Sequence, residues 1–372
     1  MIETPERPRP VLSHSLRFAL LGGALWAAAV WGAPRPTPPR VQPREFQRGM
    51  CYAHIHERGH GYGSDASRAE LGRLRGLGVT WISLTPFGYE RTVHTPHVRL
   101  PRDPSLSDSL LLRELASIHS LGMHALLKPH IWAGDFYDGR WSGEIGFETD
   151  GQWRAWLREY GRFILHYAQV AERGRAEAFC VGSELSRVTR ERPEEFRRII
   201  EAVRAVYHGP LTYAANWNQE SESIPFWDAL DWIGVNAYYD LSPAATPTAT
   251  EIEHAWVPIV ERLHRLSARW KRPVILTEVG FRSVDHPATR TYTWREFDPG
   301  AHSNEEAQRA CYEGTLRALW GRPWLAGLYW WKWYTAPDGE GPTDADFTPE
   351  GKPAEGVIRQ FYAGRAPPRS VP

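Results

Sequence analysis

The chain has 372 residues, in which 44 lysines and arginines balance 44 aspartates and glutamates. Because no net charge would attract a polyanion, the composition argues against nucleic acid as a partner and against charge-driven binding to an acidic membrane surface. The three cysteines are too few for a disulfide framework and lack the spacing of metal ligands.

The N-terminus predicts a targeting segment rather than a part of the fold. Arginines precede an uncharged stretch over 18–33, which is short for a membrane span of about 20 residues but suits a signal sequence. We expect a signal peptide or signal anchor over 1–33, a proline-rich linker over 34–44 and an unstructured tail over 365–372. The protein is therefore expected to be exported, extracellular or periplasmic, to stay membrane-anchored if the segment is not cleaved, and to be a monomer.

Eight apolar runs, dense in β-branched and aromatic residues, recur through the rest of the chain and predict strands. They begin at Arg48, Val79, His124, Ala178, Leu211, Trp232, Pro273 and Gly327. Helical periodicity predicts helices over 67–77, 107–121, 152–172, 193–207, 251–270 and 305–320, with a single turn over 224–230. This alternation predicts a parallel sheet closed into one (β/α)8 barrel domain over 45–364.

Two glutamates stand where an apolar strand gives way to polar residues, Glu184 in FCVGSEL and Glu278 in PVILTEVGF. In a (β/α)8 barrel, the C-terminal ends of the strands carry the active site. A lone glutamate there is more often solvated or paired with a cation, because burying an unpaired carboxylate is costly. Two at matching positions instead favour an acid/base and a nucleophile that cleave a glycosidic bond.

Further polar and aromatic residues fall near the ends of the other predicted strands. Because side chains alternate along a strand, we expect Cys180, Gly182 and Glu184 to share one face, and Leu276 and Glu278 another. Indole rings suit the apolar C–H faces of sugars, and the chain has 18 tryptophans. A packing role is the alternative for each of the expected substrate-binding residues, which are His130, Trp132, Asn216, Tyr238, Trp331 and Trp333.

The stretch TYAANWNQESESIPFWDALDWIGVNAYY over 212–239, with VGSEL before it and TEVGF after it, resembles glycoside hydrolase family 113. The resemblance covers about 47–362 and is most specific from the fourth to the seventh strand. It implies a retaining (β/α)8 glycosidase, with endo-β-1,4-mannanase as the characterised activity of the family. It also implies a polysaccharide or oligosaccharide substrate, no cofactor and no metal.

By position, the resemblance implies that Glu184 is the general acid/base and Glu278 the nucleophile of a double displacement. Tyr238 is placed to donate a hydrogen bond to Glu278. Many relatives in the same clan have asparagine before the acid/base, where it binds the sugar 2-hydroxyl. Ser183 stands there in this chain, and Asn216 is the candidate for that contact.

Three other functions stay open. His54 and His56 match the metal-binding pair of barrel amidohydrolases, but the fifth and sixth strands end in AANW and NAYY, without the further histidines such a site needs. A transglycosylase would use the same two glutamates, and a carbohydrate-binding barrel would use the site without catalysis. Sugar, linkage and endo or exo action depend on the cleft, which the insertions over 88–105, 133–151 and 282–303 are expected to shape.

Overall fold

The computed structural model describes residues 45–364 except 102, 299 and 338–344. The predicted targeting segment, linker and C-terminal tail, at 1–44 and 365–372, lie outside the described residues. Within the described part, no helix combines the length and the hydropathy that crossing a membrane requires.

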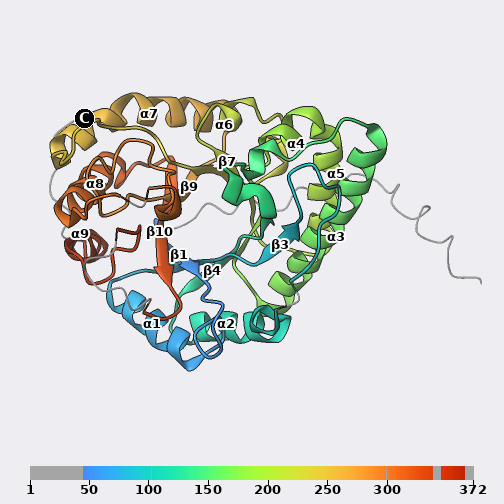
Figure 1. Ribbon diagram of the computed structural model, residues 1–372, viewed down its shortest axis with the longest axis horizontal. Coiled ribbons are helices and arrows are strands. Elements are labelled where there is room, and N and C mark those ends of the chain that lie inside the picture. Colours follow the sequence, from blue (N-terminus) through green and yellow to red (C-terminus); the bar gives the residue numbers. More distant parts are fainter. Residues whose placement is uncertain (1–44, 102, 299, 338–344, 365–372) are drawn as a thin grey trace, which may run out of the picture. The chain divides into compact units, whose positions relative to one another are not determined.

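Eight parallel strands close into a barrel in the order β1-β10-β9-β8-β7-β6-β4-β2. Their bounds are β1 (Gln47–Ala53), β2 (Trp81–Leu84), β4 (His124–Leu127), β6 (Ala178–Ser183), β7 (Leu211–Asn216), β8 (Ile233–Asn236), β9 (Val274–Val279) and β10 (Leu325–Tyr334). Each predicted apolar run supplies one of them, so the (β/α)8 prediction is confirmed. Neighbours in the barrel follow one another along the chain, and β1 closes it against β10 (Figure 1).

The helices surround the barrel (Figure 1). Those predicted from periodicity are α1 (Asp65–Gly76), α2 (Asp108–Ser120), α3 (Asp150–Gly174), α5 (Pro193–Arg204), α7 (Ala249–Trp270) and α8 (Glu305–Leu319). Capping boxes begin the two longest, because the hydroxyls of Thr149 and Thr248 accept from the third backbone N–H of α3 and α7. Three further α-helices were not predicted, namely α4 (Ser186–Glu191), α6 (Glu220–Ser223) and α9 (Pro353–Tyr362). The 3-10 turns are η1 (Pro104–Leu106), η2 (Gly134–Asp138), η3 (Ser142–Glu144), η4 (Trp227–Ala229) and η5 (Arg295–Phe297).

The third predicted strand is divided into two. After β4, the chain breaks at Pro129 and continues as β5 (His130–Ala133), which pairs in parallel with β3 (Phe87–Glu90) in a separate two-stranded sheet. Pro86 occupies the equivalent break between β2 and β3. Because proline has no N–H to donate to a ladder, both strands leave the barrel at these points.

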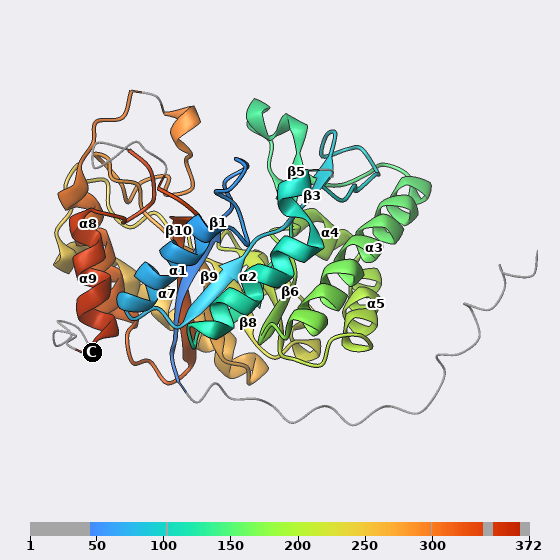
Figure 2. The same ribbon diagram turned by 90° about the horizontal axis from the view of Figure 1, so that it is seen from below.

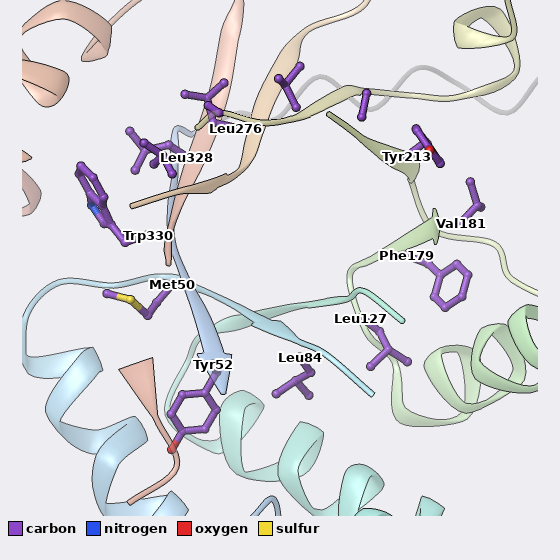
Figure 3. Close-up of a cluster of buried hydrophobic side chains, with 14 of the residues drawn as sticks. Met50, Tyr52, Leu84, Leu127, Phe179, Val181, Tyr213, Leu276, Leu328 and Trp330 are labelled. Atoms are coloured by element: carbon purple, nitrogen blue, oxygen red, sulfur yellow. The ribbon is translucent and has the colours of Figure 1, made fainter. Parts of the chain in front are cut away.

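The barrel strands present alternate residues to two hydrophobic clusters. Large side chains of the first cluster point outward, towards the helices (Figure 3). The second cluster lies inside the barrel and includes small side chains, among them Cys51, Ala178, Cys180 and Ala214. Larger side chains of the same cluster include Leu126, Trp232, Ile275 and Tyr329.

Candidate active site

A pocket of about 850 Å³ opens at the C-terminal ends of the strands, and both glutamates line it. Two segments that rise above this end of the barrel, around η2 and around η5, contribute to its walls (Figure 2). The predicted insertions over 133–151 and 282–303 thus shape the cleft as expected. None of the described residues of the insertion over 88–105 lines it.

Glu184 reaches the pocket through an irregular strand end. In β6, Cys180 pairs with Thr212 but Ser183 pairs with Ala214, so β6 contains one extra residue. Glu184 then adopts a left-handed backbone with φ of 53°, and its N–H donates to the carbonyl of Ala214 at 2.8 Å. A non-glycine residue in this region costs about 1–3 kcal/mol and is typical of functional sites, where bulges re-aim side chains.

The bulge also changes which side chains share a face. A side chain at Gly182 would lie 2.7 Å from the hydroxyl of Tyr160 on α3, so this position faces outward. Cys180 faces inward, in the interior cluster. The predicted common face of Cys180, Gly182 and Glu184 is therefore wrong, because simple alternation does not survive an extra residue.

Glu278 follows a second bulge, in β9. Leu276 pairs with Leu328 and Val279 with Trp330, which leaves one extra residue in β9 between the two pairs. Leu276 accordingly lies in the outer cluster (Figure 3), whereas Glu278 lines the pocket. The predicted shared face of Leu276 and Glu278 is wrong for the same reason.

The carboxyl of Glu184 is held as an acid. Asn216 Nδ2 donates to Glu184 Oε1 at 3.2 Å, and nearby Asn236 donates to Ser183 Oγ at 3.3 Å and accepts from Thr277 Oγ1 at 2.8 Å. Although Glu184 remains partly exposed at the pocket, protein atoms surround its carboxyl. This burial raises the pKa of Glu184 to about 8, and the negative charge of Glu278 adds to the effect.

The carboxyl of Glu278 has two strong donors. Tyr238 Oη donates to Glu278 Oε2 at 2.7 Å, as predicted from the resemblance. Lys128 Nζ donates to Glu278 Oε1 at 2.5 Å. Glu278 is only 4% exposed and Lys128 is 0% exposed, so the two form a buried ion pair. Both oxygens of this carboxyl therefore accept a hydrogen bond, one of them from a buried cation.

His130 lies beside the same carboxylate without pairing with it. Its Nε2 is 3.6 Å from Glu278 Oε1, but burial, helped by the charge of Lys128, lowers the pKa of His130 well below its usual range. The imidazole is therefore neutral. Its Nε2 has no hydrogen-bond partner among the described residues, which leaves it available to a ligand in the pocket.

The structure brings five of the six expected substrate-binding residues to the pocket with both glutamates, namely His130, Trp132, Asn216, Tyr238 and Trp331. Trp333 is the exception. It is 0% exposed, and its indole N–H donates to Glu70 Oε2 on α1 at 2.9 Å. In β10, Trp330 pairs with Met50 and Trp333 with Tyr52, so an extra residue places Trp331 and Trp333 on opposite faces. The expectation that Trp333 contacts substrate is corrected accordingly.

Sequence reasoning placed Lys128 on one strand face with His130 and Trp132 but gave it no specific role, and it did not place the aromatic residues of the long loops. Lys128 interrupts the apolar run HALLKPHIW, and a charge inside a buried strand was a usable signal. In the loop after β9, Tyr292 stacks on Trp217 with ring centroids 5.3 Å apart, and Trp294 meets Trp132 at 5.5 Å. These loop residues follow no periodicity that could have placed them.

The histidine pair at the end of β1 lies outside the lining of this pocket. His54, His56 and Asp103 cluster with candidate ligand atoms within 4.8 Å. However, His54 Nδ1 accepts from the N–H of Tyr62 at 3.0 Å, so its proton lies on Nε2, which contacts Ser105 Oγ at 3.0 Å. A neutral His54 in this arrangement has no lone pair left for a cation.

A parallel (β/α)8 barrel with a neutral glutamic acid and a paired glutamate in an aromatic pocket at its mouth is the arrangement of a glycoside hydrolase acting on O-glycosyl bonds. The chain belongs to glycoside hydrolase family 113, which its sequence matches over residues 50–352. No curated protein matches the sequence significantly.

Solved structures agree with this membership. A family 113 β-mannanase from Alicyclobacillus acidocaldarius is 28% identical, with a TM-score of 0.76, and the match covers 87% of this chain and 98% of that one. A complex of a family 113 β-1,4-mannanase is 25% identical, with a TM-score of 0.76, over 86% of this chain and 100% of that one. A β-glucuronidase from Ruminococcus gnavus, 16% identical over 86% of this chain and 50% of that one with a TM-score of 0.56, shares the fold.

Proposed function

We propose that this protein is a retaining endo-β-1,4-mannanase in which Glu278 is the nucleophile and Glu184 the acid/base. The observation that carries the proposal is the difference between the two carboxyls. Burial raises the pKa of Glu184 to about 8, whereas Glu278 accepts from Lys128 and Tyr238. Double displacement needs one protonated and one ionised carboxyl at the same pH.

The reaction follows from these two states. Glu278 attacks the anomeric carbon, while Glu184 gives its proton to the leaving oxygen, and the glycosidic bond breaks. Glu184, now ionised, takes a proton from water, whose oxygen attacks the anomeric carbon and releases Glu278. Both attacks invert the carbon, so the product keeps the configuration of the substrate.

The assignment to a polymer of mannose rests on two supports. The relative at 25% identity is described as a β-1,4-mannanase and the one at 28% identity as a β-mannanase. The pocket of about 850 Å³ is lined by Trp132 on β5 and by aromatic side chains on both raised loops, including Tyr137, Tyr292 and Trp294. Flat rings on two sides of the acid and nucleophile suit a chain that continues beyond the cleaved bond.

The test is reducing-sugar release from β-mannan, glucomannan, xylan, β-glucan and cellulose, with Glu278→Gln as the matched control. We expect cleavage of mannan that is absent in the variant, and an initial product with the β configuration by proton NMR. An initially α product would contradict retention. Products longer than the substrate would favour the transglycosylase, and a folded protein inactive on every polymer would favour the binding-only barrel or another glycan.

A further inference from the structure

The buried lysine at the end of β4 is the residue that the mechanism above leaves without a role. Lys128 Nζ contacts Glu278 Oε1 at 2.5 Å and the carbonyl of Thr277 at 3.3 Å, and it lies 5.7 Å from the ring centre of Trp331. It lies in the same interior as Cys51 and Cys180, and its charge acts on both thiols. An isolated ammonium there would be very costly, so its retention needs an explanation.

Lys128 is the cation of the site. Burial is the largest single effect and lowers the pKa of Lys128, but the surrounding acidic groups, Glu278 first among them, together raise the pKa above its usual value. Burial also raises the pKa of the Cys51 thiol to about 12 and that of Cys180 to about 11, so both stay neutral.

The other titratable groups around Glu278 carry no charge at neutral pH. His130 on β5 is a neutral imidazole. The phenol of Tyr238, after β8, has a pKa well above its usual value because of burial. Glu184, after β6, is protonated below pH about 8. Among these residues, the free site therefore holds one positive charge, on Lys128, and one negative charge, on Glu278, while the outer lining of the pocket adds Arg140, Asp240, Arg290 and Glu296.

We propose that Lys128 is a positioning residue that keeps the site electrically neutral through the whole catalytic cycle. This inference rests on the proposed function. Before the reaction, Lys128 stabilises the negative charge of Glu278. When Glu278 forms its bond to the anomeric carbon it becomes a neutral ester, and Glu184, having given up its proton, becomes the anion. The negative charge moves from one carboxyl to the other while the cation stays in place.

The position of Lys128 agrees with an effect on both carboxyls, Glu278 before the reaction and Glu184 after it. It touches Glu278 directly, and its charge also acts on Glu184, whose pKa it lowers against the larger effect of burial. In the glycosylated state, Lys128 therefore favours the ionised Glu184 that must activate water. One cation between two carboxyls stabilises whichever of them is charged.

The test is the pH dependence of kcat/KM on mannopentaose for the full-length protein and three variants. Lys128→Met keeps most of the volume and removes the charge, Lys128→Arg keeps the charge, and Cys51→Ala alters the same interior without changing any charge. We expect Lys128→Met to move the acid limb, where the nucleophile takes up its proton, to higher pH by about 1–3 units. The alkaline limb should move in the same direction by less. Lys128→Arg should restore part of the shift, and Cys51→Ala should move neither limb.

A purely structural lysine would give a different pattern. Lys128→Met would then lower the melting temperature and reduce kcat/KM by the same factor at every pH, and unmoved limbs would overturn the proposal. If the wild type cleaves no glycan, the proposed function fails, and carbon-13 NMR of glutamate-labelled protein still tests the lysine. The carboxyl signal that Glu278→Gln removes should titrate at higher pH in Lys128→Met, and an unchanged titration would overturn the inference.

Discussion

At the scale of single residues, the environment of each carboxyl assigns its chemistry. Protein atoms bury the carboxyl of Glu184, and the negative charge of Glu278 lies near it, so Glu184 holds its proton. Glu278 accepts from a lysine and a phenol. The two residues have the same side chain, and their different roles come from the burial of Glu184 and from the donors Lys128 and Tyr238 beside Glu278.

Replacement of the nucleophile gives the most direct prediction. Glu278→Ala should lose at least about a thousandfold in kcat, because no other group can form the glycosyl ester. The variant should melt at a lower temperature, because the buried ammonium of Lys128 loses its partner, but the barrel should still form, since the strand pairs of β9 do not need this side chain. Initial rates on mannan together with circular dichroism melting would check this. Activity within about tenfold of wild type, in a protein confirmed free of contaminating enzyme, would refute the assignment.

The raised pKa of Glu184 predicts the alkaline side of the pH profile. Below pH about 8 the carboxyl is protonated and can act as the acid, and above that pH it is a carboxylate, so kcat/KM on mannan should fall as pH rises through about 8. The measurement is kcat/KM between pH 5 and about 10. Glu184→Ala should be slow on mannan but much less impaired on an aryl glycoside whose leaving group needs no proton. Equal losses on both substrates would exclude Glu184 as the acid.

At the scale of elements, periodicity located the barrel strands and the principal helices but not the orientation of individual residues near the strand ends. The apolar runs and the helical periodicity are local properties, and they predicted elements correctly. The extra residues in β6, β9 and β10 are set by pairing with neighbouring strands, which a single sequence does not display. For that reason Trp331 was placed correctly, whereas Trp333 was placed on the wrong face.

Residues in the long loops were beyond prediction for a second reason. Trp294 is in contact with Trp132 although 162 positions separate them in the numbering (294 − 132). No spacing rule links the loop after β5 to the loop after β9. Only the closed barrel brings these two loops to the same side of the molecule (Figure 2).

The contact between Trp294 and Trp132 predicts a loss of kcat/KM that depends on the length of the substrate. Trp294 is 40% exposed and lines the pocket, and an aromatic contact is worth about 0.5–1.5 kcal/mol. Trp294→Ala should therefore reduce kcat/KM on mannan about two- to tenfold and change it little on a small aryl mannoside. Trp294→Phe is the matched control and should retain most of the activity. An equal loss on both substrates would show that the tryptophan acts on the catalytic centre rather than on the chain.

At the scale of the whole molecule, the last helix secures the closure of the barrel. Beta strands β1 and β10 join the two ends of the fold, and Arg48 at the start of β1 donates to the carbonyl of Tyr362 at the end of α9, at 2.6 Å. Phe361 is 1% exposed, and Trp320 at the end of α8 lies against it with ring centroids 6.1 Å apart. The stability of the barrel therefore depends on residues remote from the pocket.

Removal of the Phe361 ring should destabilise the protein without affecting the catalytic reaction. Phe361→Ala should cost about 3–5 kcal/mol in the free energy of unfolding, as is usual for a buried phenylalanine, while kcat of the folded fraction stays near wild type. Urea unfolding followed by tryptophan fluorescence measures the loss. Arg359→Ala, on the exposed side of the same helix, should cost less than about 0.5 kcal/mol. Similar costs for the two variants would show that α9 does not brace the fold.

The small residues inside the barrel have a consequence for efforts to make this enzyme more robust. The stability of a protein is often increased by enlarging small side chains in its interior, and Cys51, Cys180 and Ala214 would be the first positions to consider. In this protein the same interior holds Lys128, whose charge acts on both thiols and which donates to the reacting carboxylate. A larger side chain beside the lysine would disturb that contact, so stabilising substitutions are better sought on the helices than inside the barrel.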